Sequence, residues 1–288
     1  MSTKNHSNTN KALFDTVSDQ CCRNVTKAYS TSFSAAVRML APTIRQDIYN
    51  IYGFVRLADE IVDTFHEYRK TELFEMFSND LQLAMDHRIS LNPVLNAFQH
   101  TVYKYNIPSD LIDAFMNSMA LDLTKQVYRT HQEYADYIYG SADVVGLMCL
   151  KVFVRGDDKK YEELKDAAMH LGSAFQKVNF LRDLKTDHDE LSRSYFPQAD
   201  LDKLDEASKK AIIDEIEDDF RKGYEGILHL PLEAKFGVYT AYRYYRRLLS
   251  KLKNTPSTEI KNRRIRVPDY EKFGVFAKSY FSYKLNML

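Results

Sequence analysis

Helical periodicity that continues almost without interruption is the feature that most constrains this chain. Over residues 43–65, the apolar side chains of Ile44, Ile48, Ile51 and Val55 recur at three- and four-residue spacing, so they share one face of a helix. The 288 residues include 9 Gly and 7 Pro, and no alternating strand pattern of any length is visible. The sequence therefore predicts an all-α protein of roughly ten helices. The other predicted helices cover about 13–30, 70–88, 93–105, 109–127, 131–154, 159–191, 205–229 and 232–253, with a last one after Pro268.

No internal repeat and no Pro/Ser-rich linker divides the pattern. We therefore expect a single domain over 13–288, preceded by a polar, disordered tail over 1–12. The basic stretch 251–266 is predicted to be a loop. The last predicted helix carries an apolar stripe that we expect to face the core rather than a membrane, formed by Phe273, Phe276, Tyr280, Phe281 and Leu285.

The overall charge and the cysteines exclude several classes of protein. Lys+Arg and Asp+Glu number 40 each, which argues against a protein that coats nucleic acid. No apolar run approaches the 18 residues that a membrane span needs, and the polar first residues do not resemble a signal peptide. Cys21, Cys22 and Cys149 form neither a disulfide framework nor a spaced metal set, which favours a reducing cytoplasm. We expect a cytoplasmic protein, peripheral at most to the inner face of the membrane.

Two pairs of aspartates carry the strongest chemical signal. Asp59 and Asp63 are four residues apart, as are Asp183 and Asp187, so each pair lies on one helix face, one turn apart. Like charges at this spacing repel each other and destabilise a helix unless a cation neutralises them. Two oxygen ligands one turn apart suit Mg²⁺, which completes its shell with water and phosphate oxygens.

Apolar flanks distinguish these pairs from the other acidic pairs of the chain. Asp214 and Asp218 have the same spacing but lie in a strongly charged stretch, where a solvated helix face is expected. The first pair, in contrast, has Arg56 one turn before it, and the second has Arg182 beside it. We regard both pairs as candidate site residues for this reason.

The second pair continues a polar stripe along its helix. Gln176 and Asn179 lie on the same face as Asp183 and Asp187, among apolar neighbours. Such a stripe is costly to bury unless it lines a wet, functional cavity. If the two acidic pairs faced each other across a helical barrel, they could hold several Mg²⁺ (or Mn²⁺) ions and, through them, a diphosphate. Some of the 20 Tyr and 17 Phe could then stabilise an allylic cation formed when the diphosphate leaves.

At these residues the sequence resembles the squalene/phytoene synthase family. The resemblance covers nearly the whole chain after about residue 20 and rests on four segments. These are Tyr29-Ser30-Thr31-Ser32-Phe33-Ser34, Arg56-x-x-Asp59-x-x-x-Asp63, the tyrosine-glycine segment 137–146, and Gln176-x-x-Asn179-x-x-Arg182-Asp183-x-x-x-Asp187 followed by Arg193-Ser194-Tyr195-Phe196-Pro197.

The resemblance implies the isoprenoid synthase fold, with helices around a deep central cavity. It also implies a prenyltransferase that condenses two identical prenyl diphosphates head to head through a cyclopropyl diphosphate intermediate. Metal binding would fall to Asp59, Asp63, Asn179, Asp183 and Asp187. Contacts to the diphosphates would come from Ser30, Ser32, Arg56, Arg182, Tyr245 and Arg264. Tyr137 and Gln176 would lie near the reacting carbons.

Plainer roles compete with several of these assignments. Ser30 and Ser32 could cap a helix, Tyr137 could belong to the core, and Arg264 could be a solvated charge. Asp143 departs from the family pattern, which has small residues in the tyrosine-glycine segment. Its side chain either adds a polar group near the cavity or points away from it.

The length of the substrate can be estimated from the segment after Ser32. Val37 lies one helical turn after Phe33, and the small side chains of Ala36 and Val37 leave room that a Phe would fill. We therefore expect two C20 geranylgeranyl diphosphates to give phytoene, the first step of carotenoid biosynthesis, without a redox cofactor. The alternatives are condensation of C15 farnesyl diphosphate to dehydrosqualene or, with a nicotinamide, to squalene; a terpene cyclase; and a non-enzymatic helical module.

Overall fold

The prediction of an all-α protein is confirmed by the computed structural model, which describes residues 3–191, 193–197, 204–268, 270–272, 274–275 and 278–279. Twelve α-helices and one π-helix are delimited in this part of the chain, and the described residues among 270–279 are helical as well. It contains no strand, and its one isolated bridge pairs Val127 with Ser194. The elements are α1 (Thr3–Tyr29), α2 (Thr31–Val37), α3 (Pro42–Asp63), α4 (Lys70–His87), α5 (Pro93–Tyr105), α6 (Ser109–Asp122), α7 (His131–Ile138), the π-helix η1 (Tyr139–Asp143), α8 (Val144–Phe153), α9 (Asp158–Leu191), α10 (Glu206–His229), α11 (Leu232–Lys253) and α12 (Ser257–Ile260).

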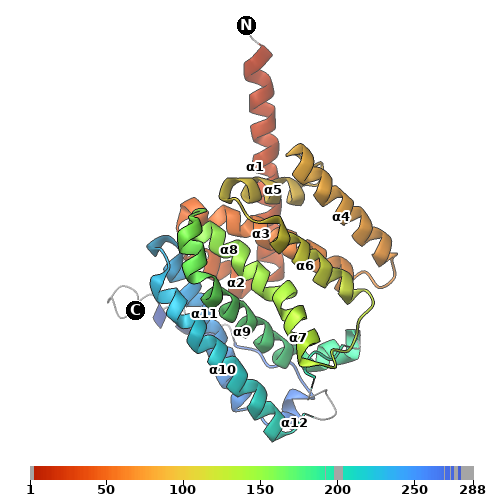
Figure 1. The fold of residues 1–288 in the computed structure, drawn as a ribbon, viewed down its shortest axis with the longest axis vertical. Coiled ribbons are helices and arrows are strands. Elements are labelled where there is room, and N and C mark those ends of the chain that lie inside the picture. Colours follow the sequence, from red (N-terminus) through yellow and green to blue (C-terminus); the bar gives the residue numbers. More distant parts are fainter. Residues whose placement is uncertain are drawn as a thin grey trace.

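The helices form two apolar cores that share a boundary. The first core joins α3 to α1, α4, α5, α6 and α8, and the second joins α9 to α10 and α11. Figure 1 shows α8, α9 and α10 running side by side, with α9 between the other two. Because α9 contacts both α8 and α10, it forms the boundary between the cores and can present side chains to the space between them.

Two helices in the middle of the chain differ from their predicted ranges. The predicted helix over 131–154 contains the π-helix η1, where Gly140 packs so closely on α6 that an added Cβ would lie 2.4 Å from Ser118 Oγ. The predicted helix over 109–127 ends at Asp122, because the chain then turns to run beside Ser194. The predicted loop 251–266 contains the end of α11 and the short helix α12.

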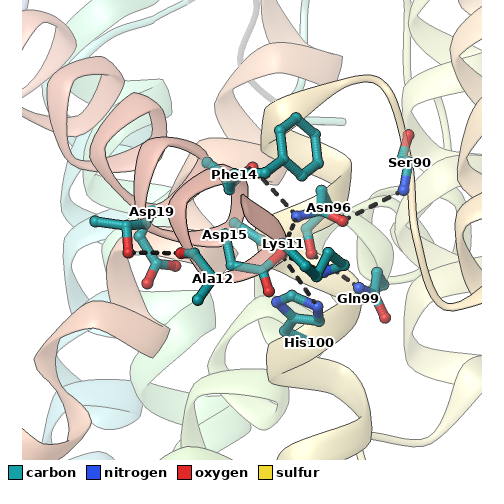
Figure 2. Close-up of polar contacts among 12 residues, drawn as sticks. Lys11, Ala12, Phe14, Asp15, Asp19, Ser90, Asn96, Gln99 and His100 are labelled. Carbon is teal, nitrogen blue, oxygen red and sulfur yellow. Dashed lines mark hydrogen bonds and ion pairs between the residues drawn. The ribbon is translucent and has the colours of Figure 1, made fainter. Parts of the chain in front are cut away.

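The first helix begins earlier than the sequence suggests. α1 starts at Thr3, so it runs through most of the range predicted to be a disordered tail, and its first half projects from the body of the molecule (Figure 1). Lys11 pairs with Asp15 one turn later on this helix. Figure 2 shows how α1 docks on α5: Asn96 Nδ2 donates to Asp15 Oδ1 at 3.0 Å, and His100 Nε2 lies 3.8 Å from the same oxygen.

None of the helices in the described ranges is long and apolar enough to cross a membrane. The predicted apolar stripe of the last helix lies outside the described residues at each of its positions, namely Phe273, Phe276, Tyr280, Phe281 and Leu285. The division into a tail and a single domain stays a prediction.

Candidate active site

An apolar cavity of about 340 Å³ lies where the two cores meet. Its walls come from α2, α3, η1, α8, α9, α10 and α11. Most of the lining is aliphatic or aromatic, and polar side chains such as Ser30, Ser32, Gln176 and Arg182 also line it. A cavity of this kind suits a long hydrocarbon chain that carries a polar group at one end.

The short helix α2 supplies one wall. Ser30 is its N-cap, and the Ser30 hydroxyl accepts a hydrogen bond from the Phe33 amide at 3.2 Å. The Phe33 ring stacks on Tyr52 of α3 with ring centroids 4.6 Å apart. Val37, one turn further on, is 2% exposed and also lines the cavity. The predicted residues of this segment thus lie at the cavity, and Ser30 is a helix cap as well.

The acidic pairs extend the lining faces of α3 and α9. On α3, Val55 lines the cavity, and Asp59 and Asp63 follow one and two turns later. On α9, Gln176 lines the cavity, and Asp183 and Asp187 follow two and three turns later. The apolar wall of each helix therefore leads into a pair of carboxylates.

The two acidic pairs lie close to each other, because Arg193 bonds both the Asp63 carboxylate of the first pair and the backbone oxygen of Asp187 in the second. Burial raises the pKa of Asp59 to about 7, with a further contribution from the charge of Asp63. Burial also raises the pKa of Asp187 to about 8, assisted by the charges of Asp183 and of Asp63. Because Asp63 belongs to α3 and Asp187 to α9, the two acid-bearing helix ends are close enough to repel each other.

Arginines occupy the space around these carboxylates. Arg56 pairs with Asp59 and Glu60, and its guanidinium lies 4.4 Å from the ring centroid of Tyr29. Asp183 is contacted by Arg182, whose Nε lies 2.8 Å from Oδ1, and by Arg264, whose Nε lies 2.7 Å from the same oxygen. All three arginines thus lie beside the acidic pairs, and their contact with the diphosphates stays a prediction.

A further arginine, Arg193, was not among the predicted site residues. Its side chain is 4% exposed, and its Nη1 donates to Asp63 Oδ1 at 2.7 Å. Its Nη2 donates to the backbone oxygen of Asp122 at 3.0 Å, and its amide donates to the backbone oxygen of Asp187 at 2.9 Å. Arg193 therefore joins the ends of α3, α6 and α9. The signal for it in the sequence is its place in the segment that follows the second acidic pair.

The acidic pairs supply ligand atoms that suit a divalent cation, but they do not by themselves form a complete metal-binding site. No group of three or more His, Cys, Asp or Glu side chains in the described ranges is arranged to hold a metal ion. Mg²⁺, however, needs only one or two protein carboxylates when phosphate oxygens and water complete its shell. The donors are hard carboxylate oxygens that Arg193 brings together at the ends of α3 and α9, and this donor set is the observation that favours a metal here, since a cation would relieve the repulsion between the carboxylates.

Of the two residues expected near the reacting carbons, Gln176 lies at the cavity and Tyr137 does not. Gln176 Nε2 donates to Ser141 Oγ at 3.3 Å, and both side chains line the cavity. Tyr137 is 3% exposed and is not part of the lining; its hydroxyl donates to Asp122 Oδ2 at 2.9 Å. The core position of Tyr137, which the sequence left open as an alternative, is the one observed.

Tyr245 and Asn179 connect α11 with α9. The Tyr245 ring lines the cavity and stacks on Phe175, with centroids 4.1 Å apart. Its hydroxyl donates to Asn179 Oδ1 at 3.3 Å. The sequence did not single out Phe175, because one aromatic residue on a long helix has no distinguishing pattern.

Asp143 lies behind the cavity wall. Its side chain is not part of the lining, and it accepts a hydrogen bond from Ser173 Oγ at 2.7 Å. Of the two orientations that the sequence left open, the structure therefore has the one that points away from the cavity.

The comparison with protein families gives one match that covers most of the chain. The profile described as "Squalene/phytoene synthase" matches residues 26–271. The chain is 28% identical to a phytoene synthase of Arthrospira platensis over 88% of its own length and 89% of that protein. It is also 28% identical to a 4,4'-diapophytoene synthase of Staphylococcus haemolyticus, over 69% of its own length and 68% of that protein.

Solved structures share the fold. A dehydrosqualene synthase in complex with ligand superposes with a TM-score of 0.80 at 20% identity, covering 94% of this chain and 98% of that one. The squalene synthase HpnC from Alicyclobacillus acidocaldarius gives a TM-score of 0.72 at 21% identity, covering 82% and 93%. The predicted helical architecture around a central cavity is therefore confirmed.

Proposed function

Since this chain belongs to the squalene/phytoene synthase family, whose members are prenyltransferase-type enzymes, we propose that it condenses two geranylgeranyl diphosphates head to head to phytoene, through a cyclopropyl diphosphate. The observation that carries the proposal is that α3 and α9 both line the apolar cavity and both end in acidic pairs that face each other. A prenyl chain would occupy the cavity, and its diphosphate would lie at the acidic end.

The acidic end would bind the diphosphates together with Mg²⁺ or Mn²⁺. The metal ligands would be Asp59, Asp63, Asp183 and Asp187, assisted by Asn179. The chemistry supplied there, with a metal bound, would be neutralisation of the charge that develops on the leaving diphosphate. Further contacts to the diphosphates would come from Ser30, Ser32, Arg56, Arg182, Tyr245 and Arg264.

Aromatic rings line the cavity next to the polar side chains. The stacked pairs Phe33–Tyr52 and Phe175–Tyr245 come from α2, α3, α9 and α11. Their faces can stabilise an allylic cation without reacting with it, and their bulk excludes water that would trap the cation. Loss of a proton from the final cation gives phytoene, so this reaction needs no redox cofactor.

We propose the C20 rather than the C15 substrate because of the position of Val37. This side chain lines the cavity one turn beyond Phe33, where a larger residue would shorten the available space. The C15 reaction to dehydrosqualene is the second candidate, favoured by the 28% identity to a 4,4'-diapophytoene synthase. In both cases the product is insoluble in water, and we propose that it leaves into a membrane that the protein contacts from the cytoplasm. No nucleic-acid partner is proposed.

The deciding experiment is incubation of the protein with labelled C15 or C20 prenyl diphosphate, with and without Mg²⁺ and NADPH, followed by identification of the hydrocarbon. Phytoene from the C20 substrate, dependent on Mg²⁺ and independent of NADPH, is the expected result. Dehydrosqualene or squalene as the main product would assign the C15 reaction. A cyclic terpene from one diphosphate would indicate a cyclase, and no diphosphate release would indicate a non-enzymatic module.

A further inference from the structure

A polar cluster that runs from buried residues to the protein surface lies behind the cavity wall, and the proposed reaction makes no use of it. Its members come from η1, α9 and α10, three elements that pack against one another. We call it the Asp143 cluster, and it consists of Asp143, His170, Ser173, Lys177, Glu215 and Asp219.

The contacts within the cluster hold Asp143 mainly through one hydroxyl. Ser173 Oγ donates to Asp143 Oδ1 at 2.7 Å. Lys177 makes its ion pairs with α10 instead: its Nζ lies 2.7 Å from Asp219 Oδ2 and also pairs with Glu215. Asp143 thus feels the charge of Lys177 without a direct ion pair, and its hydrogen bond to Ser173 is the contact that joins η1 to α9 here.

The cluster contains more acid than base. Three carboxylates face one lysine and His170, whose Nδ1 lies 2.8 Å from Asp219 Oδ1. On α7, the ring of Tyr134 lies 5.9 Å from Lys177 Nζ. Asp143 is 6% exposed, and burial raises its pKa to about 7, against the opposing effects of Ser173 and Lys177. A carboxylate at this position therefore destabilises the folded state at neutral and higher pH, where a small uncharged residue would not.

The Asp143–Ser173 hydrogen bond lies directly behind a contact of the active site. Ser141, two residues before Asp143, accepts the hydrogen bond of Gln176, three residues after Ser173. Next to these bonds the backbones of η1 and α9 also touch, because a Cβ on Gly172 would lie 2.9 Å from the oxygen of Ala142. The Gln176–Ser141 bond lies on the cavity side, and the Ser173–Asp143 bond lies behind it. Both bonds therefore hold η1 against α9.

We propose that Asp143 is a positioning residue, whose hydrogen bond from Ser173 fixes η1 against α9 and thereby holds Ser141 and Gln176 in place at the cavity wall. The inference deepens the proposed function, since it depends on Gln176 acting near the reacting carbons. It also gives a function to a carboxylate that is buried at the junction of η1 and α9.

The test compares Asp143→Ala, Asp143→Asn and Ser173→Ala in the full-length protein. Asp143→Ala and Ser173→Ala should each lower kcat for hydrocarbon formation at least about tenfold with KM unchanged, because small misplacements of reacting groups are costly. The double variant should be no slower than either single variant, since both remove the same bond. Asp143→Asn keeps an oxygen that accepts from Ser173 and should retain kcat close to that of the wild type.

Thermal unfolding distinguishes positioning from a merely structural role. Asp143→Ala and Asp143→Asn should unfold at temperatures a few degrees higher than the wild type at pH 8, and with a smaller difference at pH 5.5, where Asp143 is protonated. A loss of kcat in a protein that is more stable supports the proposal. An unchanged kcat in Asp143→Ala, or a loss of kcat that follows a lowered unfolding temperature, would overturn it.

Amide hydrogen exchange separates this inference from the proposed function. Faster exchange over 139–145 and 173–177 in Asp143→Ala, but not in Asp143→Asn, would support the positioning of Ser141 and Gln176 even if the wild-type protein formed no hydrocarbon. Equal exchange in all three proteins would overturn the inference while leaving the proposed function intact.

Discussion

Asp187 shows how the acidic site affects the stability of the protein. Its pKa is raised to about 8, so its carboxyl binds a proton more tightly in the folded state than in the unfolded state. Ionisation of Asp187 therefore lowers the free energy of unfolding as the pH rises from about 4 to about 8. We predict that Asp187→Asn raises the thermal midpoint at pH 8.5, has less effect at pH 5.5, and abolishes product formation. Thermal unfolding at both pH values and an assay of diphosphate release measure these effects.

Asp189, on the same helix, provides the control. Its pKa is lowered by Lys185 and His188, so Asp189→Asn should not raise the midpoint and should leave activity unchanged. Added MgCl2 should raise the midpoint of the wild type more than that of Asp187→Asn, because only the wild type has the full ligand set. An active Asp187→Asn variant with a wild-type response to Mg²⁺ would contradict the metal assignment.

Arg182 makes a bidentate contact that a lysine cannot reproduce. Its Nε and Nη2 both bind the carboxylate of Asp183, and its side chain also lines the cavity. We predict that Arg182→Lys, which keeps the charge but loses the planar fork, lowers kcat at least about tenfold. Arg263→Lys is the matched control, because Arg263 pairs with Glu259 at the surface. Equal rates for both variants and the wild type would show that Arg182 is not required to contact diphosphate.

At the scale of the helix, α2 offers the clearest test of substrate length. Val37 lines the cavity one turn beyond Phe33, so Val37→Phe would fill space that the end of a C20 chain needs. The enlarged side chain should cost about 1–3 kcal/mol where room is lacking, and the cost should fall on the longer substrate. We predict that Val37→Phe loses phytoene formation and retains or gains C30 product. Competition between C15 and C20 diphosphates, scored by product length, measures the ratio.

Val94→Phe is the control for overpacking in general. Val94 is buried in the first core and does not line the cavity, so its replacement should lower stability without changing the product ratio. An unchanged C40-to-C30 product ratio in Val37→Phe would show that α2 does not determine the length of the prenyl chain that the enzyme accepts.

The sequence predicts those parts of the site that repeat with the period of a helix. The stripe from Gln176 to Asp187 could be identified because each residue lies on one face of a single helix. The positions of Tyr137 and Arg193 could not, because they depend on where the chain goes after α6 and α9. The Tyr128 amide donates to the backbone oxygen of Ser194 at 3.1 Å. This contact joins segments that are distant in the sequence, so no local sequence pattern predicts it. The π-helix escaped prediction because Tyr139–Asp143 connects α7 directly to α8, with no proline or loop sequence to mark a change of helix type.

At the scale of the whole molecule, α9 serves both cores and the cavity. One of its faces packs on α10, another meets η1 and α8, and a third lines the cavity and ends in the second acidic pair. Apolar side chains such as Phe153 and Leu230 also line the cavity. The molecule thus has a long apolar interior with charge concentrated where α3, α6 and α9 end.

Arg193 is the side chain that holds those three ends together. It bonds Asp63 of α3 at 2.7 Å, and its Nε lies 3.9 Å from Asp122 of α6, while its own amide caps the end of α9 at Asp187. Removing one partner of a buried ion pair leaves the other charges unpaired, which typically costs about 3–5 kcal/mol. We predict that Arg193→Met lowers the free energy of unfolding by an amount in that range, measured by urea denaturation at neutral pH.

Adding Asp122→Asn to Arg193→Met should restore part of the loss, because it removes one of the unpaired carboxylates. Arg263→Met, at an exposed position, should have little effect on unfolding. If Arg193→Met unfolds at the wild-type urea concentration, then the acidic ends of α3 and α6 do not depend on this arginine, and another cation must balance them in the folded protein.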